Sequence, residues 1–193
     1  MLKIFPAPKA GGFTLLELLI ALTILSIIVG ISFANFNQLE RYHVQSAARS
    51  LAQSIQSART SAVQRGSSIY LCLSRDGLQC ERSAANRILI YDDLNGDKLY
   101  NADDSLIAER SFPTHIIQIK WRAFQNKRYL ELLPSGMTHY QNGTFTVCGS
   151  SNAIAVAEAV IVNMAGRPYF AKDKNKDGVK EYSNGQNLSC SSF

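Results

Sequence analysis

The chain has 193 residues, of which 46% are apolar and 18% are charged, and its formal net charge at pH 7 is +5. This composition excludes a wholly disordered chain, because enough apolar surface is present to form a core. The small positive surplus does not by itself indicate a nucleic-acid partner, since phosphate binding requires clustered Lys and Arg side chains.

The first predicted element is a membrane-length apolar helix that follows a short basic leader. Residues 9–17 read KAGGFTLLE, and residues 18–39 contain no charged side chain. A helix of roughly 20 apolar residues is long enough to cross a bilayer. A secretory signal peptide places its small-residue cleavage site after the apolar region, whereas the glycine pair here precedes it. Cleavage after Gly12 would therefore leave the helix attached to the mature chain.

Glu17, near the beginning of this apolar stretch, requires an explanation. An unpaired carboxylate in hydrocarbon costs at least about 2.5 kcal/mol on insertion scales, so a partner of opposite charge is expected. Cleavage between Gly12 and Phe13 would create an amine at nearly the same depth. The sequence therefore predicts that Glu17 pairs with such an amine, on this subunit or on a neighbouring one.

The stretch GGFTLLELLIALTILSIIV resembles the class III leader and first helix of type IV pilins and of the pseudopilins of type II secretion. The resemblance implies that a prepilin peptidase cuts after Gly12 and methylates Phe13, and that Glu17 sets the assembly register against a neighbouring subunit. It also implies a subunit with one pass through the bacterial inner membrane and a periplasmic globular domain, which then joins other major and minor pilins or pseudopilins in a filament.

The apolar helix is expected to continue as an amphipathic helix. No proline occurs between Pro8 and Pro113, and Gly66 is the first strong stop signal. One helix of about 53 residues, roughly 80 Å long, is predicted. Its core-facing positions recur every three to four residues and are Val44, Ala47, Ala48, Leu51, Ile55, Ala58 and Ala62.

After Gly66 the pattern changes to short apolar runs separated by turn residues, which predicts strands. The expected strands are 68–73, 87–91, 106–112, 116–122, 129–133, 144–148 and 159–163. The predicted fold class is α+β, in which a long N-terminal helix packs on an antiparallel β-sheet or small β-sandwich. The expected organisation is a leader at 1–12, a transmembrane half of the helix at 13–37, an amphipathic half at 38–66 and a β domain at 67–193.

This order of elements, with a Gly166-Arg167 pair near the C-terminus, resembles the H-type pseudopilins and the FimT and FimU minor pilins. The resemblance implies a structural subunit that acts in a priming or tip complex. The alternative is a FimT-like minor pilin that binds DNA for uptake in natural transformation. Its candidate residues are Arg167, Lys172, Lys174 and Lys176, although Tyr169 stands where the FimT-type motif Gly-Arg-x-Arg has its second arginine.

A second basic segment, 119–130, mixes cations with aromatic side chains, as nucleic-acid surfaces do. Strand alternation places Trp121 on the same face as Ile119, and Lys120 and Arg122 on the other face. Trp121 is therefore expected in the core and not on a nucleic-acid surface.

Four cysteines, Cys72, Cys80, Cys148 and Cys190, indicate disulfide bonds in an exported domain. Three connectivities are possible. Local closure favours Cys72 with Cys80, which leaves Cys148 with Cys190. Zinc is not expected, because there is no C-x-x-C pair and the three histidines are scattered.

Asp173, Asn175 and Asp177, followed by Gly178, match the opening of a calcium-binding loop. The usual closing glutamate is absent, and a solvated turn is the competing interpretation. A weaker copy begins at Asp93. No cofactor other than calcium is indicated, and no catalytic motif is recognisable, so an enzyme is not predicted.

Overall fold

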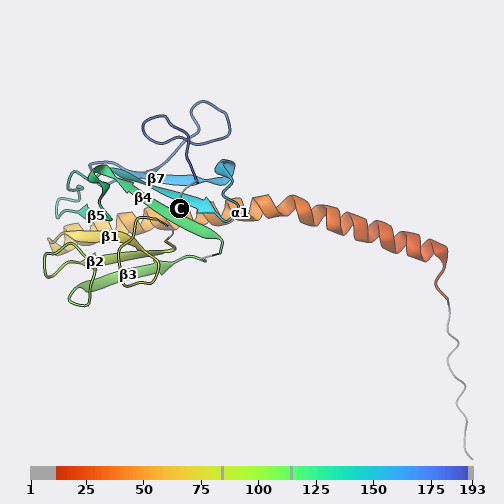
Figure 1. Cartoon of the computed structure of the whole chain (residues 1–193), viewed down its shortest axis with the longest axis horizontal. Helices are drawn as coiled ribbons and strands as arrows, with labels where there is room; N and C mark the ends of the chain where they lie inside the picture. The colour runs from red at the N-terminus through yellow and green to blue at the C-terminus, as the bar shows by residue number, and fades with distance from the viewer. Residues whose placement is uncertain (1–11, 84, 114, 191–193) are drawn as a thin grey trace, which may run out of the picture. The chain divides into compact units, whose positions relative to one another are not determined.

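The computed structural model describes residues 12–83, 85–113 and 115–190, and for residues 31–37 it describes the backbone alone. The chain forms two compact units, the described residues up to Gln38 and those from Leu39 onward. The helix α1 (Leu15–Arg65) contributes to both units, and two four-stranded antiparallel sheets belong to the second. The predicted α+β fold is confirmed (Figure 1).

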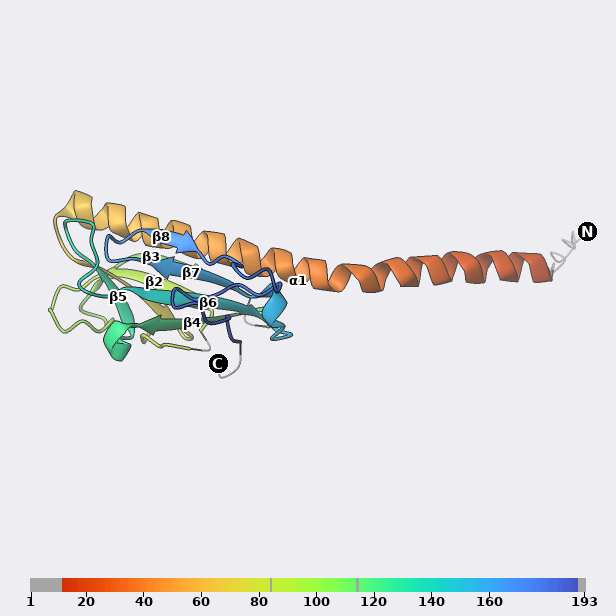
Figure 2. The ribbon, with the colours of Figure 1, turned by 90° about the horizontal axis from the view of Figure 1, so that it is seen from above.

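The C-terminal half of α1 lies along the sheets and supplies part of the main core (Figure 2). All seven positions predicted to face the core are buried, and Leu51 and Ile55 are completely inaccessible. Burial of one such side chain contributes about 1.5–3 kcal/mol. Gly66 ends the helix with φ +66°, and its N–H donates to the Ala62 carbonyl at 3.0 Å. Because glycine adopts this left-handed conformation without a Cβ clash, the predicted stop is explained.

The first sheet has the strand order β3-β2-β1-β5. Its central strand β1 is buried on both faces: Leu71 lies in the main core, whereas Tyr70 and Cys72 lie in a second cluster of tyrosines and cysteines on the opposite face. The bounds are β1 (Ile69–Ser74), β2 (Arg87–Asp92), β3 (Ser105–Ser111) and β5 (Tyr129–Leu132).

The second sheet has the strand order β4-β6-β7-β8. Trp121 is 2% exposed and stacks on Phe145 at 4.0 Å between ring centroids, so it belongs to the core as predicted. The bounds are β4 (Ile117–Ala123), β6 (Gly143–Gly149), β7 (Glu158–Val162) and β8 (Pro168–Phe170). Two single-turn 3₁₀ helices, η1 (Phe124–Asn126) and η2 (Ile154–Val156), interrupt the loops.

All seven predicted strands are present, and no strand end differs from its predicted position by more than one residue. Strand β8 was not predicted. This strand has three residues and begins with a proline, and such a segment carries no period-2 signal. It is recognised only through its pairing with β7, where Ile161 opposes Tyr169.

Two polar side chains of α1, Glu40 and Arg59, form hydrogen bonds with loops of the second unit. The Glu40 carboxylate accepts hydrogen bonds from the Ser151 backbone N–H at 2.8 Å and from Ser151 Oγ at 2.6 Å. Near the other end, Arg59 Nε donates to the Gly136 carbonyl at 2.9 Å. These hydrogen bonds fix the position of the helix along its own axis. Apolar packing alone specifies that position less precisely.

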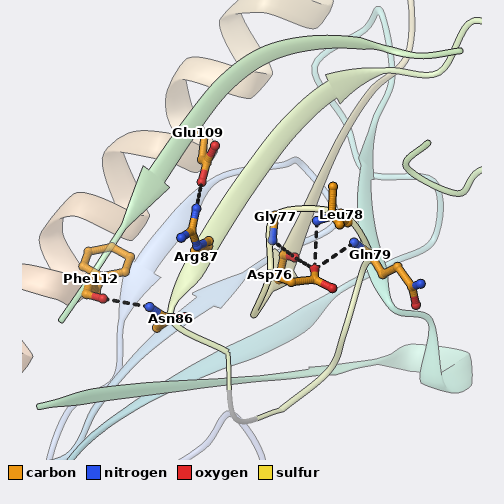
Figure 3. Close-up of polar contacts among 9 residues, drawn as sticks. Asp76, Gly77, Leu78, Gln79, Asn86, Arg87, Glu109 and Phe112 are labelled. Atoms are coloured by element: carbon orange, nitrogen blue, oxygen red, sulfur yellow. Dashed lines mark hydrogen bonds and ion pairs between the residues drawn. The ribbon is translucent and has the colours of Figure 1, made fainter. Parts of the chain in front are cut away.

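The ends of β1, β2 and β3 are tied by a separate set of polar contacts (Figure 3). Asn86 Nδ2 donates to the Phe112 carbonyl at 2.9 Å, and Arg87 pairs with Glu109 across β2 and β3. In the turn after β1, Asp76 Oδ1 accepts the backbone N–H groups of Leu78 and Gln79. These bonds to the charged form lower the pKa of the Asp76 carboxyl.

Candidate assembly site

The start of α1 brings the predicted processing and assembly residues into one local structure. Thr14 precedes the first helical residue, and its Oγ1 accepts the Glu17 backbone N–H at 3.3 Å. A threonine at the N-cap with a glutamate three residues later is the sequence pattern of a capping box, and the bond to Thr14 satisfies one of the backbone donors that a helix start leaves unpaired. Sequence reasoning missed this role of Thr14, although the signal T-x-x-E was present in the chain.

Glu17 lies in the first turn of α1, where the helix macrodipole stabilises negative charge. Its side chain is exposed within its own unit, and Phe13, at 85% exposure, lies just outside the helix. Gly12 precedes Phe13, and residues 1–11 of the expected leader lie outside the described residues. An exposed carboxylate at a helix start, close in sequence to the proposed new amine, is suited to an ion pair between subunits.

Among the described residues, no helical segment is both long enough and apolar enough to cross a membrane. Residues 31–37 of the expected span 13–37 lie outside the residues whose side chains are described. Within the described part, Thr23 Oγ1 donates to the Ile20 carbonyl and Ser26 Oγ to the Thr23 carbonyl, each at 2.8 Å. These polar side chains are thus satisfied inside the helix itself.

Both cysteine pairs form disulfides. Cys72 joins Cys80 with 5.5 Å between Cα atoms, and Cys148 joins Cys190 with 5.9 Å, both within the usual range. The second bond holds residues 171–190, the C-terminal segment, on the outer face of the second sheet. There Ala171 and Leu188 are buried against β6 and β7. This segment is dark blue in Figure 1.

The carboxylates of the predicted calcium loop bind the backbone of their own loop. Asp173 accepts the N–H groups of Lys176 and Gly178, at 2.6 and 2.9 Å. Asp177 accepts hydrogen bonds from the side-chain amide of Asn187 and from the backbone N–H of Val179, and these bonds lower the pKa of its carboxyl. No group of three or more His, Cys, Asp or Glu side chains arranged for a metal ion occurs in the described part of the chain. Calcium binding stays a prediction.

The residues proposed for DNA binding are exposed but dispersed. Arg167 lies in the turn between β7 and β8, whereas Lys172, Lys174 and Lys176 lie in the loop that also carries Asp173 and Asp177. Gly166, the other member of the Gly-Arg pair, has φ +70°, and a Cβ atom there would collide with the Gly136 carbonyl oxygen. This glycine therefore has a structural role, and DNA binding gains no specific support.

Buried tyrosines surround the Cys72–Cys80 disulfide on the outer face of the first sheet. The rings of Tyr70 and Tyr91 stack at 5.5 Å between centroids, and Tyr91 Oη donates to the Lys98 carbonyl at 3.3 Å. Burial, with the nearby Glu131 and Asp93 carboxylates, raises the pKa of Tyr70 above its usual range. Burial also raises the pKa of Tyr91. Both phenols are thus held neutral, as a core requires.

Comparison with known families gives two matches along the chain. Residues 47–166 match the family described as type II transport protein GspH, and residues 8–33 match the prokaryotic N-terminal methylation motif. The first match covers more than half of the chain and most of the second unit. The second covers the predicted cleavage site, Glu17 and the first part of α1.

Among individual proteins, one relative is identical to this chain at about a third of the aligned positions. The pilin-like protein PilA1 of Thermus thermophilus is 32% identical over 110 residues, which are 57% of this chain and 62% of that protein. The match thus spans less than two thirds of the relative's length.

Among solved structures, the type IV minor pilin FimU of Pseudomonas aeruginosa (strain PAO1) has a similar fold. Its crystal structure in space group P21 aligns with a TM-score of 0.55 and 20% identity, covering 78% of this chain and 97% of FimU. The P65 crystal form gives a TM-score of 0.51, also at 20% identity, over 68% and 94% of the two chains. At this identity the likeness concerns the fold. Because its family match spans more than half of its length, the chain belongs to the type II transport protein GspH family, and its N-terminal part carries the prokaryotic N-terminal methylation motif.

Proposed function

We propose that this chain is a structural subunit of the priming or tip complex of a type IV pilus or type II secretion pseudopilus. A prepilin peptidase removes residues 1–12 and methylates the new amine of Phe13. The subunit is then held in the inner membrane by one pass of the N-terminal half of α1, with its second unit in the periplasm, until it enters the filament beside other pilins or pseudopilins. It carries out no catalysis in this role.

The observation that carries the proposal is the structure at the start of α1. Thr14 caps the helix through the Glu17 backbone N–H, and the Glu17 carboxylate is exposed in the first helical turn, close in sequence to the position of the new amine. A carboxylate in a low-dielectric environment needs a charged partner. The methylated amine of a neighbouring subunit supplies one, so that the ion pair sets the axial register of one subunit against the next.

Two further observations support the proposed location. Two disulfides, with no free cysteine among the described residues, suit an oxidising compartment such as the periplasm. The methylation motif covers residues 8–33, which include the proposed cleavage site and the helix start.

The N-terminus of the mature chain tests the processing step. Mass spectrometry of the chain purified from its native membrane should find a peptide that begins at Phe13 and carries one methyl group on its amine. Gly12→Val should leave the leader attached, because the peptidase acts after this glycine. Gly30→Ala is the control, since a Cβ at Gly30 meets no atom within 4 Å in the described structure. A mature chain that begins at another residue would overturn the proposed processing.

A further inference from the structure

Two adjoining pockets lie over the outer face of the second sheet. The first has a volume of about 450 Å³ and lies between η1, the start of β6, the β7–β8 turn and the C-terminal segment. The second, of about 420 Å³, lies between β4 and the C-terminal segment. Each volume falls in the range of about 300–1,000 Å³ that is usual for small-ligand sites. The two pockets share Arg122 and Tyr182.

Strand alternation directs Arg122 to this face. Ile119 and Trp121 are buried in the core, so Lys120 and Arg122 lie on the opposite side of β4. Their cross-strand partners on β6 are the buried hydroxyl residues Thr146 and Thr144. The guanidinium carbon of Arg122 lies 5.3 Å from the ring centroid of Tyr182, which holds the cation between the two pockets.

Tyr182 is itself fixed from two sides. Its Oη lies 3.4 Å from Thr146 Oγ1 and accepts the Ser189 backbone N–H at 3.3 Å. The neighbouring disulfide between Cys148 and Cys190 holds the segment that carries these contacts. The wall that divides the two pockets is therefore pre-organised, which reduces the entropy cost of binding.

The pocket linings are basic, amide-rich and aromatic. Among the described residues, no acidic side chain lines either pocket, and none forms an ion pair with Arg122. Phe124 and Tyr169 line the first pocket with 59% and 45% of their surface exposed. Five amide side chains line the two pockets: Asn142, Asn163, Asn184, Gln186 and Asn187.

This combination distinguishes between possible ligands. An amide side chain donates and accepts hydrogen bonds, as does a sugar hydroxyl, whereas a phosphate only accepts them. Exposed aromatic faces bind flat apolar surfaces such as those of sugar rings. A nucleic-acid strand would require cations along its path, but Arg122 is the one cation in the described lining of the first pocket, and Lys120 adds a single further cation in that of the second. The lining therefore favours a hydroxyl-rich ligand with a low density of negative charge.

We propose that this face binds an acidic oligosaccharide of the uronic-acid class, whose carboxylate pairs with Arg122 and whose sugar rings occupy the pockets on both sides of Tyr182. Arg122 determines the preference for an acidic sugar, because a guanidinium binds a carboxylate in bidentate geometry. The amides and the exposed aromatic rings bind the uncharged parts of the sugar chain.

The test is calorimetric titration of the full chain, in a detergent without a sugar head group, with tetragalacturonate as the probe and neutral maltotetraose as its uncharged counterpart. We expect tetragalacturonate to bind about tenfold or more tightly than maltotetraose, since a charge-assisted hydrogen bond is lost with the neutral sugar. Arg122→Gln should abolish this preference. Asn142→Ala, in the first pocket, should weaken binding of both sugars about fivefold through a lost neutral hydrogen bond.

The matched control is Arg110→Gln, which removes an exposed arginine from β3 in the other sheet and should leave binding unchanged. Unchanged melting temperatures would show that the variants are folded. No binding of tetragalacturonate at millimolar concentration, or equal binding by the Arg122→Gln variant, would overturn the proposal. An oligothymidylate that binds more tightly than tetragalacturonate and depends on Arg122 would also overturn it, in favour of a nucleic-acid surface.

Discussion

Thr14 and Glu17 are joined at the start of α1 by a hydrogen bond of 3.3 Å from the Glu17 backbone N–H to Thr14 Oγ1. The glutamate that the family resemblance links to assembly is thus also the third residue of the helix, whose backbone N–H is bonded by the N-cap side chain. Its loss would remove a charge and also alter the helix start. Thr14 allows the two effects to be separated, because its replacement leaves the carboxylate in place.

Thr14→Ala should loosen the first turn of α1 by about 1 kcal/mol, the usual cost of losing an N-cap side chain. Hydrogen exchange of the first-turn amides, measured by mass spectrometry on the full chain, should then become several-fold faster. Thr23→Ala is the control, since that hydroxyl bonds the Ile20 carbonyl within the same helix and should leave the first turn as it was. Equal exchange in the Thr14 variant and the unchanged chain would refute the cap.

The two disulfides should contribute unequally to stability. The Cys148–Cys190 bond spans 42 positions and the Cys72–Cys80 bond spans 8. Chain-entropy reasoning predicts that removing the first costs about 4 kcal/mol and removing the second about 2.5 kcal/mol. Denaturant midpoints of the two double Cys→Ser variants provide the measurement. A larger loss from the shorter loop would show that local strain or packing outweighs loop entropy.

The sequence predicts those features that depend on local pattern. The core face of α1 from Val44 to Ala62 follows from its spacing, and the stop at Gly66 follows from glycine's access to positive φ. The burial of Trp121 follows from alternation along β4. Thr14 was missed, although its capping-box signal is equally local.

Apart from the Cys148–Cys190 disulfide, features that depend on contacts between distant segments were not predicted. The assignment of each strand to one of the two sheets and the bond between Glu40 and Ser151 depend on residues far apart in the chain. The two pockets that share Arg122 and Tyr182 were not predicted for the same reason, because these two residues are 60 positions apart in the sequence and meet only in the folded unit. No periodicity within one segment carries such information.

Gly166→Ala should destabilise the second unit by about 2–4 kcal/mol. An alanine at φ +70° costs about 1–2 kcal/mol, and its Cβ would also collide with the Gly136 carbonyl oxygen, which adds an overpacking cost. Gly185→Ala is the matched control: φ is +83° there, but no atom lies within 4 Å of the added Cβ. Only the backbone cost should remain in that variant. Chemical denaturation of the two variants checks the difference, and equal losses would contradict the close contact between Gly166 and Gly136.

The stability of the second unit should fall as the pH rises above about 10. Burial raises the pKa of Tyr91 above its ordinary value of 10.0, so the folded chain retains a proton that the unfolded chain releases. The stabilisation is fully present below pH 10 and is lost as the pH rises through the folded-state pKa. Tyr91→Phe should cost about 1 kcal/mol at pH 7, from the lost bond to the Lys98 carbonyl, yet reduce the alkaline loss. Denaturation curves between pH 7 and pH 11 provide the measurement, and an identical slope in the variant would rule out Tyr91 as its source.

The most direct test of the proposed assembly is the amount of this subunit in sheared filaments when Glu17 is replaced. Glu17→Val should leave the chain inserted in the membrane and cut after Gly12, because the processing residues are unchanged, but should reduce its incorporation at least tenfold. Thr23→Val, a substitution in the same apolar helix that removes no charge, should be incorporated normally. Normal incorporation of the Glu17→Val variant, at equal levels of membrane-inserted and processed protein, would contradict the account.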